Sequence, residues 1–225
     1  KKIISSNLKK KLTYQDIGFS IGPLINSSGR IAKANDVVEL FLTQNDDKID
    51  KILNKMNINN VKRKKIEQES LALIDFKKYN RKNIIFIFNK KFHEGIIGII
   101  AAKLSQIFNK PCFVITESHN ILKCSIRSGN NLKISKTINK LIANKLIISG
   151  GGHDEAGGFT ARKVHLSDIE DFLNIEYKTL NTKSYSYFDA FTIFPNKNSS
   201  IINDLKCLEP FGKDNPEPIF YFKNI

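Results

Sequence analysis

Two short stretches of the sequence carry side chains that bind anionic oxygens. The first runs from Lys123 to Gly129 and places Ser125, Arg127 and Ser128 at the end of an apolar run. A strand that ends in hydroxyls, a guanidinium and glycine amides offers an edge that suits a phosphate. A solvated hairpin end has the same residue types, so the pattern leaves both interpretations open.

The second stretch is the run Gly150-Gly151-Gly152-His153. Consecutive glycines let a ligand approach the main chain, and the imidazole can hydrogen-bond a phosphate or act as an acid or base near neutral pH. The alternative is a flexible turn with an incidental histidine. A metal role for His153 with its acidic neighbours is a weaker hypothesis, because adjacent residues rarely converge on one ion.

Two further positions are candidates with plain alternatives. Arg30 follows Ser28 and Gly29 and could contact a phosphate or cap a neighbouring helix. His93 opens an apolar helical pattern and could belong to an anion site, although a simple N-terminal cap accounts for it equally well. The lysine clusters at 1–11 and 62–65 are typical of solvated faces. With no DxD, DHH-type or acidic cluster, these residues cannot assemble a two-metal hydrolase centre.

The composition points to a polyanionic partner, with nucleic acid first. The net charge is +14, from 36 Lys and Arg against 22 Asp and Glu. Of the basic residues 31 are Lys and five are Arg, so part of the charge reflects a drift toward Lys, Ile and Asn. Each scarce arginine is therefore a candidate for a task that lysine performs badly, such as bidentate phosphate binding.

Other compositional features exclude several classes of protein. The chain is 41% hydrophobic and 26% charged, which excludes a disordered or fibrous protein, and it has no apolar run of about 18 residues to span a membrane. Three cysteines without short spacing predict neither disulfides nor a zinc site, which favours the cytoplasm. The chain starts at Lys1 without a signal peptide, and we expect it to be a piece of a longer protein.

The elements that would position these residues differ along the chain. Residues 20–34 contain Gly, Pro and Ser and predict a loop anchored by Leu24 and Ile25. Helices are expected over 37–43, capped by Asn35 and Asp36, and from Asp46 onward, continuing through 62–65 to about Tyr79. The apolar face of this long connecting helix would comprise Ile49, Ile52, Leu53 and Met56.

From residue 83 the pattern alternates between strands and helices, which predicts an α/β domain over 83–180. Strands are expected at 84–88, 111–116, 121–128 and 158–162, and helices at 93–108, 132–148 and from Ser167 to about Leu180. For the helix at 132–148, the alternative is that Ile147 and Ile148 already lie beyond its end. The inner face of the helix at 93–108 would comprise Ile96, Ile97, Ile100, Leu104 and Ile107. Residues 185–194 and 219–222 predict strands of a separate β-rich unit.

Taken together, these motifs resemble a known family. The matching stretches are IGPLINSSGRI (21–31), HEGIIGIIAAKL (93–104), LKCSIRSG (122–129) with GGGHDEAGGFT (150–160), and LEPFGKDNPEPIF (208–220). In this order they resemble the C-terminal two-thirds of the RecJ-type single-stranded-DNA-specific exonucleases, members of the DHH phosphoesterase superfamily. The last stretch is the most specific, because it resembles the OB fold of these exonucleases.

The resemblance implies an α/β architecture of four parts. Residues 1–45 would be the tail of the catalytic DHH domain, 46–82 the connecting helical segment, 83–180 the DHH-associated domain, and 181–225 the start of an OB-fold domain. The parent protein would be a Mn²⁺- or Mg²⁺-dependent 5′→3′ exonuclease on single-stranded DNA in repair and recombination, with its metal ligands upstream. A helicase or a single-strand-binding protein would be a partner.

The resemblance also implies roles for individual residues. Arg30, Ser125, Arg127 and His153 would hold the DNA backbone or the scissile phosphate. The supporting positions would be Ser128, Gly151, Gly152 and His93. Cys124 and Ile126 stand where the family usually has glycine, which would narrow the approach of the backbone. The alternatives are a phosphoesterase on short oligonucleotides or nucleotide phosphates, and a non-catalytic nucleic-acid-binding module.

Overall fold

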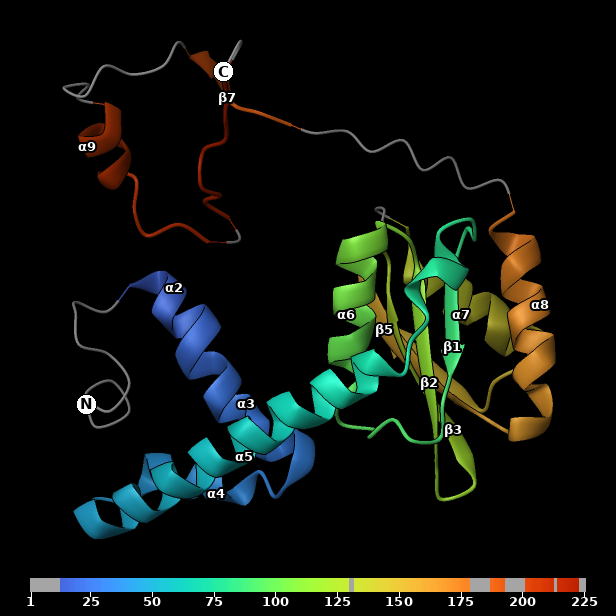
Figure 1. Ribbon diagram of the computed structural model, residues 1–225, viewed down its shortest axis with the longest axis horizontal. Coiled ribbons are helices and arrows are strands. Elements are labelled where there is room, and N and C mark those ends of the chain that lie inside the picture. The colour runs from blue at the N-terminus through green and yellow to red at the C-terminus, as the bar shows by residue number, and fades with distance from the viewer. Residues whose placement is uncertain (1–12, 130–131, 179–186, 193–200, 213, 223–225) are drawn as a thin grey trace.

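The computed structural model describes residues 13–129, 132–178, 187–192, 201–212 and 214–222. Its described part begins with a helical unit, continues through one long helix into an α/β domain, and ends in a small C-terminal unit (Figure 1). The helical unit contains α2 (Tyr14–Asp16), the π-helical turn η1 (Ile17–Ile21), α3 (Gly22–Ile31), α4 (Asn35–Leu42) and the first half of α5 (Asp46–Ala72). None of the described helices is long and apolar enough to cross a membrane.

Helix α3 corrects the loop expected at 20–34. Pro23 lies in the first turn, where its fixed φ fits a helix and its missing N–H costs nothing. Ser27 and Ser28 are buried, and the Ser27 hydroxyl donates to the Leu24 carbonyl at 2.6 Å. The Gly, Pro and Ser residues that indicate a loop in isolation here lie within a helix that packs on α5.

The long helix α5 confirms the predicted apolar face, since Ile52, Leu53 and Met56 are buried against Leu24 and Leu40. Asn45 caps the helix by accepting from the Lys48 N–H at 3.0 Å. The helix ends at Ala72, earlier than the expected Tyr79, and a separate 3₁₀ turn, η2 (Phe76–Tyr79), follows it. Helix α4 forms as expected, but Asp36 pairs with Lys55 of α5 instead of capping its own helix.

The α/β domain is built on a five-stranded sheet in the order β1-β2-β3-β5-β4. The strands are β1 (Ile85–Phe88), β2 (Cys112–Ser118), β3 (Ile121–Arg127), β4 (Ser149–Gly152) and β5 (Ala156–Ala161). Strands β1 and β2 are parallel, and the other neighbours are antiparallel. The expected α/β class is confirmed.

Helices cover the two faces of the sheet unequally. Helices α7 (Ile134–Ala143) and α8 (Leu166–Glu176) pack on one face, with the short 3₁₀ turn η3 (Lys163–His165) before α8 (Figure 1). Helix α6 (Ile97–Phe108) packs on the other face, chiefly over β2 and β3. The β5–β4 end of that second face is therefore left open beside α6, and the candidate site lies there.

Several predicted boundaries in this domain were wrong. Residues 93–96 form a turn before α6, because the chain must first pass over the end of α3. Ile107 is 61% exposed, so it does not belong to the inner face of α6. Helix α7 ends at Ala143 and Ile147 is buried in the core beyond it, and α8 ends at Glu176, short of the expected Leu180.

The glycine run lies in strand β4, so it is not the flexible turn that the sequence allowed as an alternative. Gly150 pairs with Phe159 and Gly152 with Gly157 of β5. A Cβ on Gly152 would lie 2.4 Å from the Ala156 oxygen and 2.4 Å from the Gly157 Cα, so only glycine allows this close pairing. The run therefore has a structural reason that the sequence pattern alone did not show.

The C-terminal unit contains β6 (Ala190–Thr192), α9 (Ile201–Lys206) and β7 (Phe220–Phe222) in its described residues. Strands β6 and β7 pair in parallel, which confirms strands at 190–192 and 220–222; part of the expected strand at 185–194 lies outside the described residues. The unit touches the beginning of the described chain, where the Tyr14 ring meets the Phe211 ring edge-on with centroids 6.0 Å apart. One strand pair does not establish an OB fold, which stays a prediction.

Candidate functional site

The centre of the candidate site is a pair of arginines from distant parts of the sequence. Arg30 lies in the last turn of α3, and Arg127 is the last residue of β3. Arg30 Nη1 donates to the Gly95 carbonyl at 3.2 Å, and Arg127 Nη1 donates to the Ile126 carbonyl at 2.8 Å and to Ser125 Oγ at 3.3 Å. Burial, and then the nearby charge of Arg30, lower the pKa of Arg127.

Neither guanidinium forms an ion pair within the part of the chain that the structure describes. Two positive charges brought together without a carboxylate repel each other, which costs free energy until an anion lies between them. The pair is therefore arranged to receive an anionic oxygen, and a phosphate is a suitable ligand for two planar guanidiniums.

A close contact between the two domains brings Arg30 to this position. A Cβ on Gly95 would lie 1.9 Å from the Arg30 carbonyl oxygen, so the turn before α6 can touch the end of α3 only because residue 95 is glycine. In the same turn, the Gly95 carbonyl accepts a hydrogen bond from the Arg30 side chain. The position of Arg30 is therefore set by backbone packing and by a side-chain hydrogen bond at one residue.

A cavity of about 500 Å³ surrounds the pair, and we call it the arginine cavity. Its lining includes Arg30, Gly98, Lys123, Ser125, Arg127 and Gly158. Because side chains alternate along a strand, Lys123, Ser125 and Arg127 share the face of β3 that α7 and α8 leave uncovered. The sheet surface beside Ser125 carries no side chain, because its partner in β5 is Gly158.

The same alternation corrects the expected narrowing by Cys124 and Ile126. Both side chains are buried in the core beneath α7 and α8, on the opposite face of β3 from Arg127. The two side chains therefore do not occupy the open face. The backbone approach on the side of Ser125 is therefore unaffected by these two side chains.

A row of small residues extends the open face away from Arg127. Ser125 pairs with Gly158 of β5, which in turn pairs with Gly151 of β4, so these three residues lie side by side across the sheet. Gly151 is exposed, and a Cβ there would meet nothing within 4 Å. This row leaves room for a chain to lie across the sheet beside the arginine cavity.

His153 lies at the same end of the sheet but outside the arginine cavity. Its backbone N–H donates to the Ala156 carbonyl at 2.8 Å and closes the β4–β5 hairpin, and the residue is exposed. Ala156 pairs with Arg127, so His153 is separated from β3 by the width of two strand spacings, roughly 10 Å. An extended ligand could contact both Arg127 and His153. A single phosphate bound by Arg127 would lie too far from the His153 backbone to contact it.

The two remaining candidates occupy different positions. Ser128 is buried and lines a neighbouring cavity of about 360 Å³ on the other side of Arg127, together with Ser105 and Gln106. The imidazole Nδ1 of His93 accepts from the Gly95 N–H at 3.1 Å. His93 therefore stabilises the turn before α6 and does not cap the helix itself, whose N-cap is Ile96 without a side-chain hydrogen bond. It does not line the arginine cavity.

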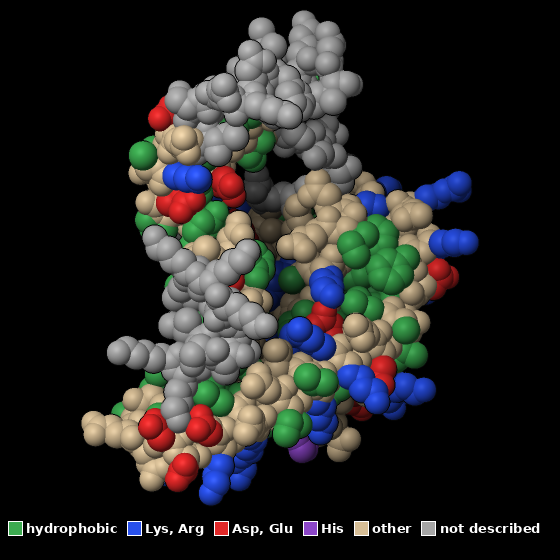
Figure 2. Space-filling model, turned by 60° about the vertical axis from the view of Figure 1, so that its left-hand side comes forward, with side chains coloured by type: hydrophobic (Ala, Val, Ile, Leu, Met, Phe, Trp, Pro, Cys, Tyr) green, Lys and Arg blue, Asp and Glu red, His purple; other side chains and the backbone are tan. Residues whose placement is uncertain are grey.

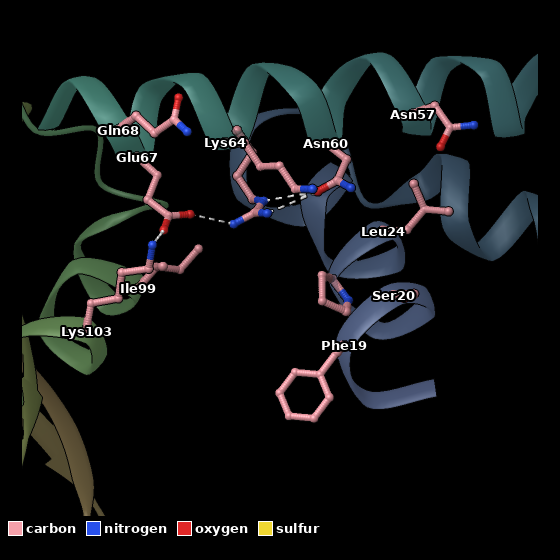
Figure 3. A pocket seen from close by; sticks show the side chains of 12 residues that line it. Phe19, Ser20, Leu24, Asn57, Asn60, Lys64, Glu67, Gln68, Ile99 and Lys103 are labelled. Carbon is pink, nitrogen blue, oxygen red and sulfur yellow. Dashed lines mark hydrogen bonds and ion pairs between the residues drawn. The ribbon is translucent and has the colours of Figure 1, made fainter. Parts of the chain in front are cut away.

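The sequence patterns missed a second charged cluster on α5. Arg63 in the lysine-rich run is buried, which corrects the expectation that 62–65 is a uniformly solvated face. Arg63 Nη1 donates to Glu67 Oε2 at 2.8 Å, Arg63 also bonds Asn60, and the other Glu67 oxygen pairs with Lys103 of α6 (Figure 3). The available signals were one arginine among lysines and a glutamate four residues later.

The overall charge does not mark the site. On the face drawn in Figure 2, Lys and Arg side chains are spread over several elements with acidic side chains among them. No group of three or more His, Cys, Asp or Glu residues that could hold a metal ion occurs within the described ranges. These residues therefore do not fit a metal centre. The local chemistry of the site is that of two guanidiniums, the Ser125 hydroxyl, open backbone and the Lys123–Glu94 ion pair.

Comparisons with known proteins agree with this organisation. The DHHA1 domain family matches residues 81–181. The curated relatives include the single-stranded-DNA-specific exonuclease RecJ of Haemophilus influenzae, 27% identical over 179 residues, which are 73% of this chain and 30% of the relative. The RecJ of Bacillus subtilis is 24% identical over 220 residues, which are 93% of this chain and 28% of the relative.

A solved structure shows the same fold. The crystal structure of RecJ from Thermus thermophilus in complex with Mn²⁺ aligns with a TM-score of 0.85 and 20% identity, over 98% of this chain and 33% of that chain. The chain spans 28–30% of the length of the two curated relatives. Residues 81–181 therefore match the DHHA1 domain family, and the chain as a whole is similar to RecJ exonucleases over about a third of their length.

Proposed function

We propose that this chain supplies the DNA-gripping part of a 5′→3′ single-stranded-DNA exonuclease that acts in DNA repair and recombination. The observation that carries the proposal is the meeting of Arg30 and Arg127 without a carboxylate partner among the described residues. Two guanidiniums in one partly buried cavity suit a phosphate of the DNA backbone. The named substrate of the RecJ relatives, single-stranded DNA, supports the same ligand.

Each candidate residue has a role within this proposal. Arg30 and Arg127 bind the backbone or the scissile phosphate, and the Ser125 hydroxyl orients the Arg127 guanidinium and can also donate to the ligand. His153 contacts the strand farther along, at the end of β4. Among the supporting positions, Ser128 lines the cavity behind Arg127, and Gly151 leaves the open face free of a side chain. Gly152 allows the close pairing of the β4–β5 hairpin, and His93 stabilises the turn before α6.

The domain organisation is part of the proposal. We assign residues 1–45 to the tail of a catalytic DHH domain, 46–82 to the connector, 83–180 to the gripping domain and 181–225 to the start of an OB-fold domain. The solved relatives contain Mn²⁺ or Mg²⁺, and we place the ligands of such an ion outside the described residues. A cytoplasmic location and a helicase or single-strand-binding partner stay predictions.

A direct test compares Arg127→Ala with Lys65→Ala in the intact protein. Lys65 lies on α5, exposed and away from the arginine cavity. Losing a charge-assisted contact to phosphate should weaken binding of a 5′-phosphorylated oligonucleotide by roughly tenfold to a hundredfold. Binding is measured in EDTA so that no strand is cut, and Mn²⁺-dependent degradation is measured separately. Equal effects of the two substitutions on binding would contradict a specific contact at Arg127.

A further inference from the structure

A second hollow lies between α3, α5 and α6, and we call it the connector groove. It has a volume of about 700 Å³. In Figure 3, Phe19 and Ser20 come from one side, Ile99 and Lys103 from the other, and α5 forms the wall between them. A hollow of this size is in the range of sites that hold small organic ligands.

The connector groove is continuous with the arginine cavity through shared side chains. A smaller hollow of about 270 Å³ lies between them. Arg30 lines both this hollow and the arginine cavity, whereas Arg63 and Ile99 line both this hollow and the connector groove. The three hollows therefore form a series that runs from Ser125 past Arg30 to Phe19.

The charge of the connector groove is suited to an anion. Its lining contains three cations, Arg63, Lys64 and Lys103, and one carboxylate, Glu67. Both Glu67 oxygens are already paired, one with Arg63 and one with Lys103. Lys64 is exposed and has no ion pair within the described part of the chain, so its charge is available to a ligand.

Phe19 provides a surface of a different kind. Its side chain is 84% exposed at the edge of the groove, although an exposed phenyl ring gains nothing from water. Amide side chains from Asn57, Asn60 and Gln68 also line the groove, and they offer donors and acceptors. An exposed aromatic ring beside lysines is the combination with which proteins hold single-stranded nucleic acid, by base stacking and backbone neutralisation.

We propose that the connector groove is a second subsite for the same strand, in which one base stacks on Phe19 and the neighbouring phosphate lies near Lys64. This subsite rests on the proposed function, because it extends the strand held at Arg30 and Arg127. The strand passes from the arginine cavity along the intermediate hollow and enters the groove between α3 and α6. The occupant is a nucleotide farther along the strand, so its binding depends on strand length.

The test measures binding of a 5′-phosphorylated dinucleotide and decanucleotide to the intact protein in EDTA. Phe19→Leu keeps an apolar side chain but removes the stacking ring. It should lower the affinity for the decanucleotide about tenfold and leave the affinity for the dinucleotide unchanged. Phe19→Tyr should retain the affinity. Lys64→Ala should reduce the slope of log K against log salt for the decanucleotide by about 0.7, the value for one phosphate contact on a single strand.

Matched controls and a second signal separate the possible outcomes. Phe41→Leu removes another exposed ring, on α4, and Lys65→Ala removes another charge from α5. Neither substitution should change the affinity for the decanucleotide. A 2-aminopurine base moved along the decanucleotide should show one stacked position that Phe19→Leu abolishes. An unchanged decanucleotide affinity in Phe19→Leu, as when another segment of the protein covers the ring, would overturn the subsite. A dinucleotide affinity indifferent to Arg127→Ala would instead refute the proposed function.

Discussion

Two clusters of basic side chains lie close together in this molecule and differ in one respect. Arg30 and Arg127 meet without an ion pair to a carboxylate among the described residues, whereas Arg63 and Lys103 share Glu67 between them. In the first cluster the charges have no partner among the described residues, which favours binding of an external anion. In the second each of the two cations has the Glu67 carboxylate as an internal partner, and this shared contact joins α5 to α6. The task of a buried arginine therefore follows from its partners more than from its burial.

The largest expected effect comes from breaking the compensated cluster. Glu67→Ala removes the carboxylate and leaves Arg63 as a buried charge without its partner. We expect a loss of about 3–5 kcal/mol in the free energy of unfolding, measured by denaturant titration. Glu69→Ala is the control, because Glu69 is exposed and its contact with Lys65 is long, 3.9 Å. A loss no larger than that of the control would show that Arg63 needs no internal partner.

An intermediate effect is expected where packing sets the uncompensated pair. Gly95→Ala places a methyl group 1.9 Å from the Arg30 oxygen and must push α3 away from the turn. We expect a loss of about 1–3 kcal/mol in stability together with weaker oligonucleotide binding, because Arg30 moves away from Arg127. Gly212→Ala, where a Cβ would also meet nothing within 4 Å and which lines none of the three hollows, serves as the control. Unchanged binding in Gly95→Ala would mean that the spacing of the two arginines does not matter.

The smallest effect concerns Glu94, the only acidic side chain that lines the arginine cavity among the described residues. Hydrogen bonding from Lys123, and then from Ser118, lowers its pKa. Glu94→Gln frees Lys123, so oligonucleotide affinity should rise a few-fold, while stability near pH 7 falls by less than about 1 kcal/mol, as for an exposed ion pair.

The pH dependence gives this prediction its sign. A carboxylate whose folded pKa is lowered contributes stability above its unfolded pKa and loses that contribution as the pH falls through the folded value. The stability difference between the natural protein and Glu94→Gln should therefore shrink on acidification below the ordinary glutamate pKa. A difference that grows in acid, measured by unfolding at a series of pH values, would contradict the ion pair.

The parts of the fold that were predictable are those with a strong local pattern. The predictions of the apolar strand at 84–88 and of the buried face of Ile52, Leu53 and Met56 on α5 were correct. Burial leaves a pattern of apolar residues that can be recognised within a few positions of the sequence. Helix α3 was missed, since its Gly, Pro and Ser residues are also those that favour loops. The edge strand β4 was missed for a similar reason, because close strand pairing and turns both select glycine.

By itself the sequence determined which residue types can bind a phosphate. It also determined the resemblance of the chain to RecJ-type proteins, in whose motifs Arg30 and Arg127 lie. Only the tertiary structure decided which of these residues meet. The contact at Gly95 brings Arg30 beside Arg127, the sheet register puts His153 two strands away, and the fold buries Arg63 against Glu67. The physical reason is that charge compensation depends on distances between residues far apart in the chain, and such distances exist only after packing.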